Sequence, residues 1–257
     1  MNSVILQKTK VGLLENGKDS VRTALLHFLD RQIDNRGEYH HTKWVNVCAY
    51  HAAECISNLF LLENDPENNL IMLKDSEYRF PHLDQVLPIL KGQQFRGVLS
   101  DSERMLLKMY GKLSENRHKF MHRIAPDNAD MSVAAISILG TLRMLKNHKG
   151  ILTADLLDTS PPVEADIASV IKTESARSYE RYIAQVMKEE KLGNYFEHCP
   201  NCDLQTVHES ECWACFEVFE MAFCKDCDES TIYMSWLPAS GELAIGCKDC
   251  GANLPIS

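Results

Sequence analysis

Apolar residues recur at spacings of three and four along most of the first 190 residues. This is the pattern of amphipathic helices that pack around a common core. It is clearest in residues 11–32 and in residues 43–62, and the second stretch stops at the turn-rich sequence ENDPENN. Residues 82–92 show it over a shorter length. We therefore expect a helix in each of these three stretches.

Three more helices are predicted farther along the chain, in residues 100–123, 128–150 and 163–191. The first of them begins with a serine or aspartate cap followed by Glu103 and stops before Pro126, as the capping rules for helix ends predict. No alternation typical of a strand has a useful length before residue 195. The N-terminal part is therefore expected to be helical, with His40 and His41 in a loop before Trp44.

The last part of the chain has a different pattern, because eight of its residues form four C-x2-C pairs. The pairs are Cys199 and Cys202, Cys212 and Cys215, Cys224 and Cys227, and Cys247 and Cys250. One pair places two thiolates on a tight turn, and two pairs complete a tetrahedral site, so the count suits two structural Zn²⁺ ions. Disulfides are the alternative, but the chain shows no export signal and is expected among reduced thiols.

Zinc would also supply stability that this tail lacks, because the tail has few large apolar side chains. A structural zinc ion contributes on the order of 10–16 kcal/mol of apparent binding free energy. Sequential pairing of the four C-x2-C pairs closes the shortest loops and is favoured, while the interleaved arrangement stays open. The predicted fold is mainly α, with a helical domain in residues 1–158, a linker and connecting helix in 159–194, and a zinc-stabilised domain with short β-hairpins in 195–257.

Most of the negative charge belongs to the tail. Residues 191–257 hold eleven carboxylates and three lysines, which gives −8 of the total charge of −9. Metal-bound thiolates would add to this charge, so the tail would repel phosphate. We expect it to act as a scaffold, as a protein contact or in substrate exclusion, and direct RNA binding is the less favoured reading.

The sequence carries no sign of export or of a membrane span. The start, MNSVILQKTK, lacks the basic-then-apolar layout of a signal peptide. The longest apolar run, MSVAAISILGTLRML, is short and contains Arg143. We therefore expect a cytoplasmic protein without a membrane partner.

The helix predicted in residues 100–123 carries a charge in its apolar stripe. The stripe is formed by Leu106, Met109, Tyr110, Leu113, Phe120 and Met121. Arg117 falls near its middle, where burial of a charge requires a partner, a phosphate or an interface. At about 100° per residue, His122 lies roughly 140° around the helix from Arg117, so a second copy of the helix is needed to bring both types of side chain to one atom.

Basic residues also follow a flank of this helix at roughly four-residue spacing, among them Lys112, Lys119 and Arg123. These three are candidate RNA contacts. A solvated helix face with extended lysines is the equally supported alternative.

The sequence Arg117-His118-Lys119-Phe120-Met121-His122, late in the fourth predicted helix, resembles the R-x4-6-H motif of the HEPN superfamily. The sequence WVNVCAYHAAECISNLFLL is similar to the second helix of that family, with its small-small-acidic step at Ala52, Ala53 and Glu54. FPHLDQVL resembles the segment that follows. The resemblance covers about residues 20–150, and HEPN domains followed by C-x2-C clusters extend it to the tail.

The resemblance implies a metal-independent endoribonuclease that acts as a homodimer, with RNA as substrate and no metal in catalysis. It implies that His122 is the acid or base at the ribose 2′-hydroxyl or the leaving oxygen, and that Arg117 holds the phosphate. It gives Glu54 and His118 roles in orientation or substrate contact. It also makes a toxin or antiviral defence role, with an antitoxin or regulatory protein as partner, a hypothesis.

Two plainer interpretations stay open. Many HEPN domains are dimerising or regulatory modules without activity, and His118 or His122 could serve only to bind the last carbonyls of the helix. Cys48, His51 and Cys55 fall on one helical face, and core packing is favoured over metal binding for them.

Overall fold

The computed structural model describes residues 3–33, 38–74, 77–92, 95, 97–122, 131–157, 197–199, 204–208, 210–213, 218–223 and 230–233. The chain divides into two compact units, Met1–Ser175 and Ala176–Ser257. The division falls within the stretch predicted to connect the two domains. The helix predicted in residues 163–191 lies outside the described residues.

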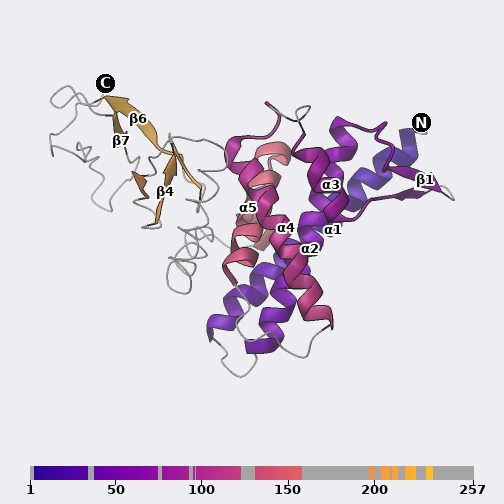
Figure 1. Cartoon of the computed structure of the whole chain (residues 1–257), viewed down its shortest axis with the longest axis horizontal. Helices are drawn as coiled ribbons and strands as arrows, with labels where there is room; N and C mark the ends of the chain where they lie inside the picture. Colours follow the sequence, from indigo (N-terminus) through magenta and orange to yellow (C-terminus); the bar gives the residue numbers. More distant parts are fainter. Residues whose placement is uncertain are drawn as a thin grey trace. The chain divides into compact units, whose positions relative to one another are not determined.

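The first unit is helical, which confirms the mainly α fold class (Figure 1). Its described helices are α1 (Ser3–Ile33), α2 (Glu38–Asn64), α3 (Leu83–Leu90), α4 (Asp101–His122), α5 (Met131–Lys149) and α6 (Thr153–Leu157). Helix α2 is the centre of the unit, because it packs against α1, α3, α4 and α5. Its interior positions include Ala49, Ala52 and Ala53, whose small side chains allow this close packing.

The apolar character of α2 follows from this central place. The stretch His40–Asn64 is long and apolar enough to pass as a membrane span, but 78% of its most apolar window is buried inside the protein. Among the described residues it is the one such helix, and it is weak evidence for a membrane span.

Two features of this unit differ from the sequence-based expectation. His40 and His41 are part of α2 rather than of a loop, and both rings lie against His27 of α1, 5.9 and 5.2 Å from it between centroids. An antiparallel hairpin of β1 (Met72–Lys74) and β2 (Glu77–Arg79) lies between α2 and α3. Its strands have three residues each and are mostly exposed, so no alternation of apolar and polar residues marks them.

Helix α4 begins with the capping box that the sequence predicts. The backbone N–H of Ser100 donates to Glu103 Oε2 at 2.9 Å, and the backbone N–H of Glu103 donates to Ser100 Oγ at 3.3 Å. Glu103 is buried, and its Oε1 atom also lies 3.0 Å from Asn147 Nδ2 and 3.1 Å from His148 Nε2 on α5. Burial alone would raise the pKa of Glu103, but the hydrogen bonds from His148, Ser100 and Asn147 hold it below its ordinary value.

Replacing Glu103 with alanine should lower the free energy of unfolding by about 2 kcal/mol at neutral pH, because it removes the hydrogen bonds that a buried carboxylate accepts from Ser100, Asn147 and His148. The pKa of Glu103 is lowered by folding, so its contribution is present above the ordinary carboxyl pKa of about 4 and is lost as the pH falls through the lowered value. Urea unfolding followed by circular dichroism at several pH values measures this, with the exposed Glu67→Ala as control. Equal stabilities for the two variants at pH 7 would contradict the prediction.

The second unit contains short antiparallel strands, as predicted. Strands β3 (Glu197–His198), β4 (Gln205–His208) and β5 (Glu211–Cys212) form one sheet in that order, and β6 (Glu220–Phe223) pairs with β7 (Ser230–Tyr233). Cys199 directly follows β3 and Cys212 ends β5, so the first cysteines of the first two C-x2-C pairs lie at strands of one sheet. Leu204, Val207 and Trp213 are buried beside them.

Candidate functional site

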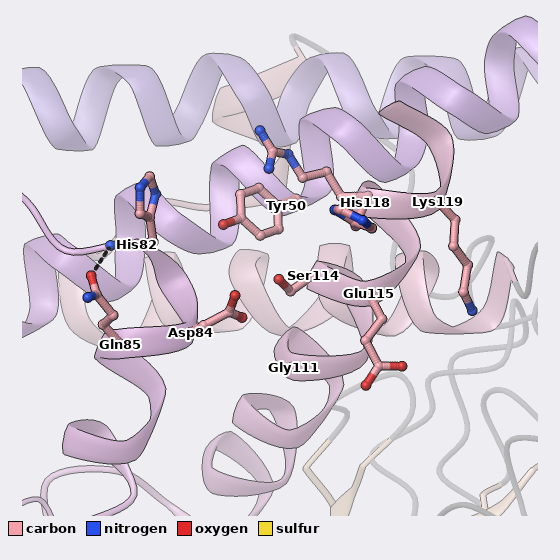
Figure 2. A pocket seen from close by; sticks show the side chains of 10 residues that line it. Tyr50, His82, Asp84, Gln85, Gly111, Ser114, Glu115, His118 and Lys119 are labelled. Carbon is pink, nitrogen blue, oxygen red and sulfur yellow. Dashed lines mark hydrogen bonds between the residues drawn. The ribbon is translucent and has the colours of Figure 1, made fainter. Parts of the chain in front are cut away.

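An open groove of about 960 Å³ lies between α2, the beginning of α3 and the second half of α4 (Figure 2). It is lined by Tyr50, His82, Asp84, Gln85, Gly111, Ser114, Glu115, Arg117, His118 and Lys119. Three consecutive basic residues of the predicted motif therefore face the same space as the beginning of α3. Figure 2 draws Tyr50 between His82 and His118.

The structure corrects the predicted surroundings of Arg117. Its side chain is exposed rather than buried in the apolar stripe, and its Cζ atom lies 4.8 Å from the centroid of the Tyr50 ring. This distance is that of a cation–π contact, which contributes about 0.5–1 kcal/mol at an exposed site. Met121 is also outside the core, with half of its surface exposed. The apolar stripe of α4 is thus narrower in its last turns than the sequence suggests.

Tyr50 links Arg117 to Glu54 on α2. The two α2 residues are four positions apart, so they lie on one helix face, and the Tyr50 hydroxyl donates to Glu54 Oε1 at 3.1 Å. Burial, the nearby Glu54 charge and this hydrogen bond raise the pKa of Tyr50 to about 12, with a smaller effect of Asp84, and Arg117 opposes them. Tyr50 is therefore a neutral hydrogen-bond donor at physiological pH and cannot act as a base.

The beginning of α3 contacts the same carboxylate. The backbone N–H of Leu83 donates to Glu54 Oε1 at 3.2 Å, and His82 Nδ1 lies 3.6 Å from that oxygen. The Gln85 side chain accepts a hydrogen bond from the His82 backbone N–H at 3.1 Å, which is the dashed line in Figure 2. One oxygen of Glu54 thus joins Tyr50 of α2 to the beginning of α3.

The predicted site residues come together in part. Arg117, His118 and Lys119 line the groove, and Glu54 reaches Arg117 through Tyr50. Lys112 is exposed on α4 but does not line the groove.

The positions of the His122 and Arg123 side chains relative to the groove stay untested. The His122 backbone ends α4, but the His122 side chain and all of Arg123 lie outside the described residues. The expectation that Arg117 and His122 meet across a dimer stays a prediction.

The sequence interpretation missed Tyr50 and His82. Tyr50 could have been found, because it precedes Glu54 by one helical turn. His82 gives no such signal, because it reaches Glu54 only through the packing of α3 against α2.

Two of the eight paired cysteines fall in the described residues, Cys199 and Cys212. Both residues are buried, and Thr206 Oγ1 lies 3.1 Å from Cys212 Sγ. The zinc site expected from these two residues stays a prediction. The other six, Cys202, Cys215, Cys224, Cys227, Cys247 and Cys250, lie outside the described residues. Within the described ranges, no three histidine, cysteine or acidic residues are arranged to hold a metal ion.

The cysteines of α2 fit core packing rather than metal binding. His51 Nδ1 lies 2.7 Å from Ser20 Oγ, and His51 Nε2 lies 3.7 Å from Cys55 Sγ. Burial and the nearby Glu54 charge raise the pKa of Cys55 to about 11. Burial, with a smaller effect of Asp19, also raises the pKa of Cys48. Protonated thiols of this kind are poor metal ligands.

No protein-family model matches this chain, and comparison with curated proteins and with solved structures gives no significant match.

Proposed function

We propose that the chain is a metal-independent endoribonuclease of HEPN type that acts as a homodimer. The observation that carries this proposal is the position of Arg117 in an open groove, stacked on a tyrosine that is hydrogen-bonded to Glu54. A cation presented in this way binds a phosphodiester while its planar fork stays free to pair with two oxygens. His118 and Lys119 add basic groups to the same groove.

The reaction follows from the chemistry of RNA. A base removes the proton of the ribose 2′-hydroxyl, the 2′ oxygen bonds to phosphorus, and the bond from phosphorus to the 5′ oxygen breaks. An acid gives a proton to the departing 5′ oxygen, so the products are a 2′,3′-cyclic phosphate and a 5′-hydroxyl. Arg117 stabilises the charge that develops on the phosphate. His122 transfers a proton, because a histidine titrates near neutral pH.

The homodimer is part of the proposal because Arg117 and His122 point about 140° apart on a regular helix. A two-fold axis beside α4 pairs the end of this helix with its own copy. The half-exposed Met121 supports this pairing, since it offers apolar surface close to Arg117 and His122.

The tail is proposed to hold two structural Zn²⁺ ions. Cys199, which directly follows β3, and Cys212, which ends β5 of the same sheet, support sequential pairing, because that scheme needs the first two C-x2-C pairs to be neighbours. Zinc would stabilise this unit and take no part in the cleavage. A cytoplasmic toxin or antiviral effector, with an antitoxin or regulatory protein as partner, is the role that the HEPN resemblance suggests.

A non-catalytic HEPN module that dimerises and binds partners through its zinc-binding tail is the second candidate. The observation that favours it is the pair of carboxylates, Asp84 and Glu115, that line the same groove. Negative charge there opposes the binding of an RNA backbone.

Replacing His122 with alanine decides between the two candidates. Incubated with total RNA, the variant should cut about 10²–10⁴ times more slowly than the wild type, while its fold and dimer stay intact. The exposed His40 on α2, changed to alanine, is the matched control and should cut normally. Wild-type protein that binds RNA without cutting it, together with an indistinguishable His122→Ala variant, would establish the binding module instead.

A further inference from the structure

We propose that His82, oriented by Glu54, is the general base of the groove and removes the proton of the 2′-hydroxyl of an RNA substrate. The proposal rests on the endoribonuclease function proposed above and names the residue that starts the reaction. His82 lies outside the R-x4-H sequence and directly precedes α3, whereas Arg117 belongs to α4.

The backbone around His82 is fixed on both sides by α2. Asn58 Nδ2, which is buried, donates to the carbonyl oxygen of Pro81 at 3.1 Å. The N–H of Leu83 donates to Glu54 on the same helix at 3.2 Å. The N–H of His82 itself is bound by the Gln85 side chain. An anchored backbone of this kind holds the histidine at one place, which a catalytic group requires.

The side chain of His82, unlike its anchored backbone, is open to solvent, with 84% of the side-chain surface exposed. Its Nδ1 atom lies 3.6 Å from Glu54 Oε1, and the carboxylate is 24% exposed. That carboxylate is itself oriented by the Tyr50 hydroxyl and the Leu83 N–H. A carboxylate beside Nδ1 favours the tautomer with its proton on Nδ1, which leaves the lone pair of Nε2 for a substrate proton. Such contacts commonly shorten when substrate binds.

The base and the phosphate-binding residue are joined through Tyr50. The Tyr50 ring carries the Arg117 guanidinium on its face, and the Tyr50 hydroxyl binds the carboxylate that orients His82. His82, Tyr50 and Asp84 all line the groove (Figure 2). Arg117 and His82 line the same groove, so a phosphodiester held by Arg117 would enter the space that His82 also faces.

The step balances without any further reactant. The proton of the 2′-hydroxyl goes to His82 Nε2, the 2′ oxygen bonds to phosphorus, and the bond from phosphorus to the 5′ oxygen breaks. His122 then supplies the proton that the 5′ oxygen takes. Two histidines with separate tasks replace one histidine that has to serve both ends of the reaction.

Two substrates separate the base from the acid. RNA needs both groups, whereas uridine 3′-(4-nitrophenyl phosphate) needs only the base, because nitrophenolate leaves without a proton. His82→Gln should slow both substrates by about 10²-fold or more. His122→Ala should slow RNA and leave the activated ester nearly as fast as in the wild type. His40→Gln, which changes an exposed histidine about 15 Å along α2 from Tyr50, is the control for the substitution.

Glu54 is a positioning residue, and its role is tested by a double variant. Glu54→Gln should slow the activated ester in the wild-type background and have almost no further effect when His82→Gln is present. A purely structural role of Glu54 would instead give independent effects that multiply.

The remaining outcomes are distinct from one another. A His82→Gln variant that cuts both substrates like the wild type overturns the proposal and leaves the endoribonuclease function standing. The proposal is also overturned if His82→Gln slows RNA but cleaves the activated ester at the wild-type rate, because His82 would then be the acid. It is likewise overturned if His118→Gln slows both substrates and His82→Gln slows neither. Wild-type protein that cleaves neither substrate overturns the endoribonuclease function itself.

Discussion

Replacing Arg117 with alanine should reduce RNA cleavage by about 10²–10³-fold, the usual loss when a preorganised donor to the transition state is removed. The helical unit should lose at most about 1 kcal/mol of stability, because Arg117 is exposed and its described packing contact is the stack on Tyr50. Arg117→Lys should recover only part of the rate, since an ammonium keeps the charge but cannot pair with two phosphate oxygens. Single-turnover cleavage of a labelled RNA measures both variants.

The control is Lys8→Ala, which removes one positive charge from an exposed position of α1 away from the groove. It separates loss of a specific contact from loss of general attraction to RNA. Light scattering on the same samples reports whether Arg117 also supports the dimer. Equal cleavage by Arg117→Ala, Lys8→Ala and the wild type would show that Arg117 does not contribute to cleavage.

The second large effect concerns the cysteine-rich unit. Replacing Cys199 with serine should release one of two Zn²⁺ ions and unfold the sheet of β3, β4 and β5, because a structural zinc site contributes on the order of 10 kcal/mol or more to folding. Elemental analysis gives the zinc count, and limited proteolysis reports the unfolding. The helical unit has its own core and should keep its circular dichroism signal.

Cys48→Ser is the matched control, because Cys48 belongs to α2 and to none of the C-x2-C pairs. It should keep both zinc ions. Native protein without zinc, or a Cys199→Ser variant with the full zinc count and an intact tail, would contradict the zinc proposal.

The helices could be predicted because their apolar positions repeat over many turns. The capping box at Ser100 and Glu103 confirms one predicted helix start at the level of single hydrogen bonds. The hairpin of β1 and β2 gave no signal, because three exposed residues per strand carry no usable alternation. His40 and His41 were predicted in a loop, but both belong to α2, and their rings contact His27 of α1.

The candidate site was predictable only where its residues share an element or a motif. Arg117, His118 and Lys119 are consecutive on α4, and the family resemblance added Glu54. The exposure of Arg117 was not predictable, because helical periodicity gives the direction of a side chain but not where the neighbouring helices end. The contact of His82 with Glu54 depends on tertiary packing of α3 against α2, which no local pattern encodes.

The most direct test of the central claim is to identify the ends that wild-type protein leaves on RNA in the presence of EDTA. Mass spectrometry of the fragments should show 2′,3′-cyclic phosphate and 5′-hydroxyl ends, and an RNA methylated at every 2′ oxygen should stay intact. Intact RNA after incubation with well-folded, dimeric protein, or fragments with 3′-hydroxyl and 5′-phosphate ends, would contradict the account.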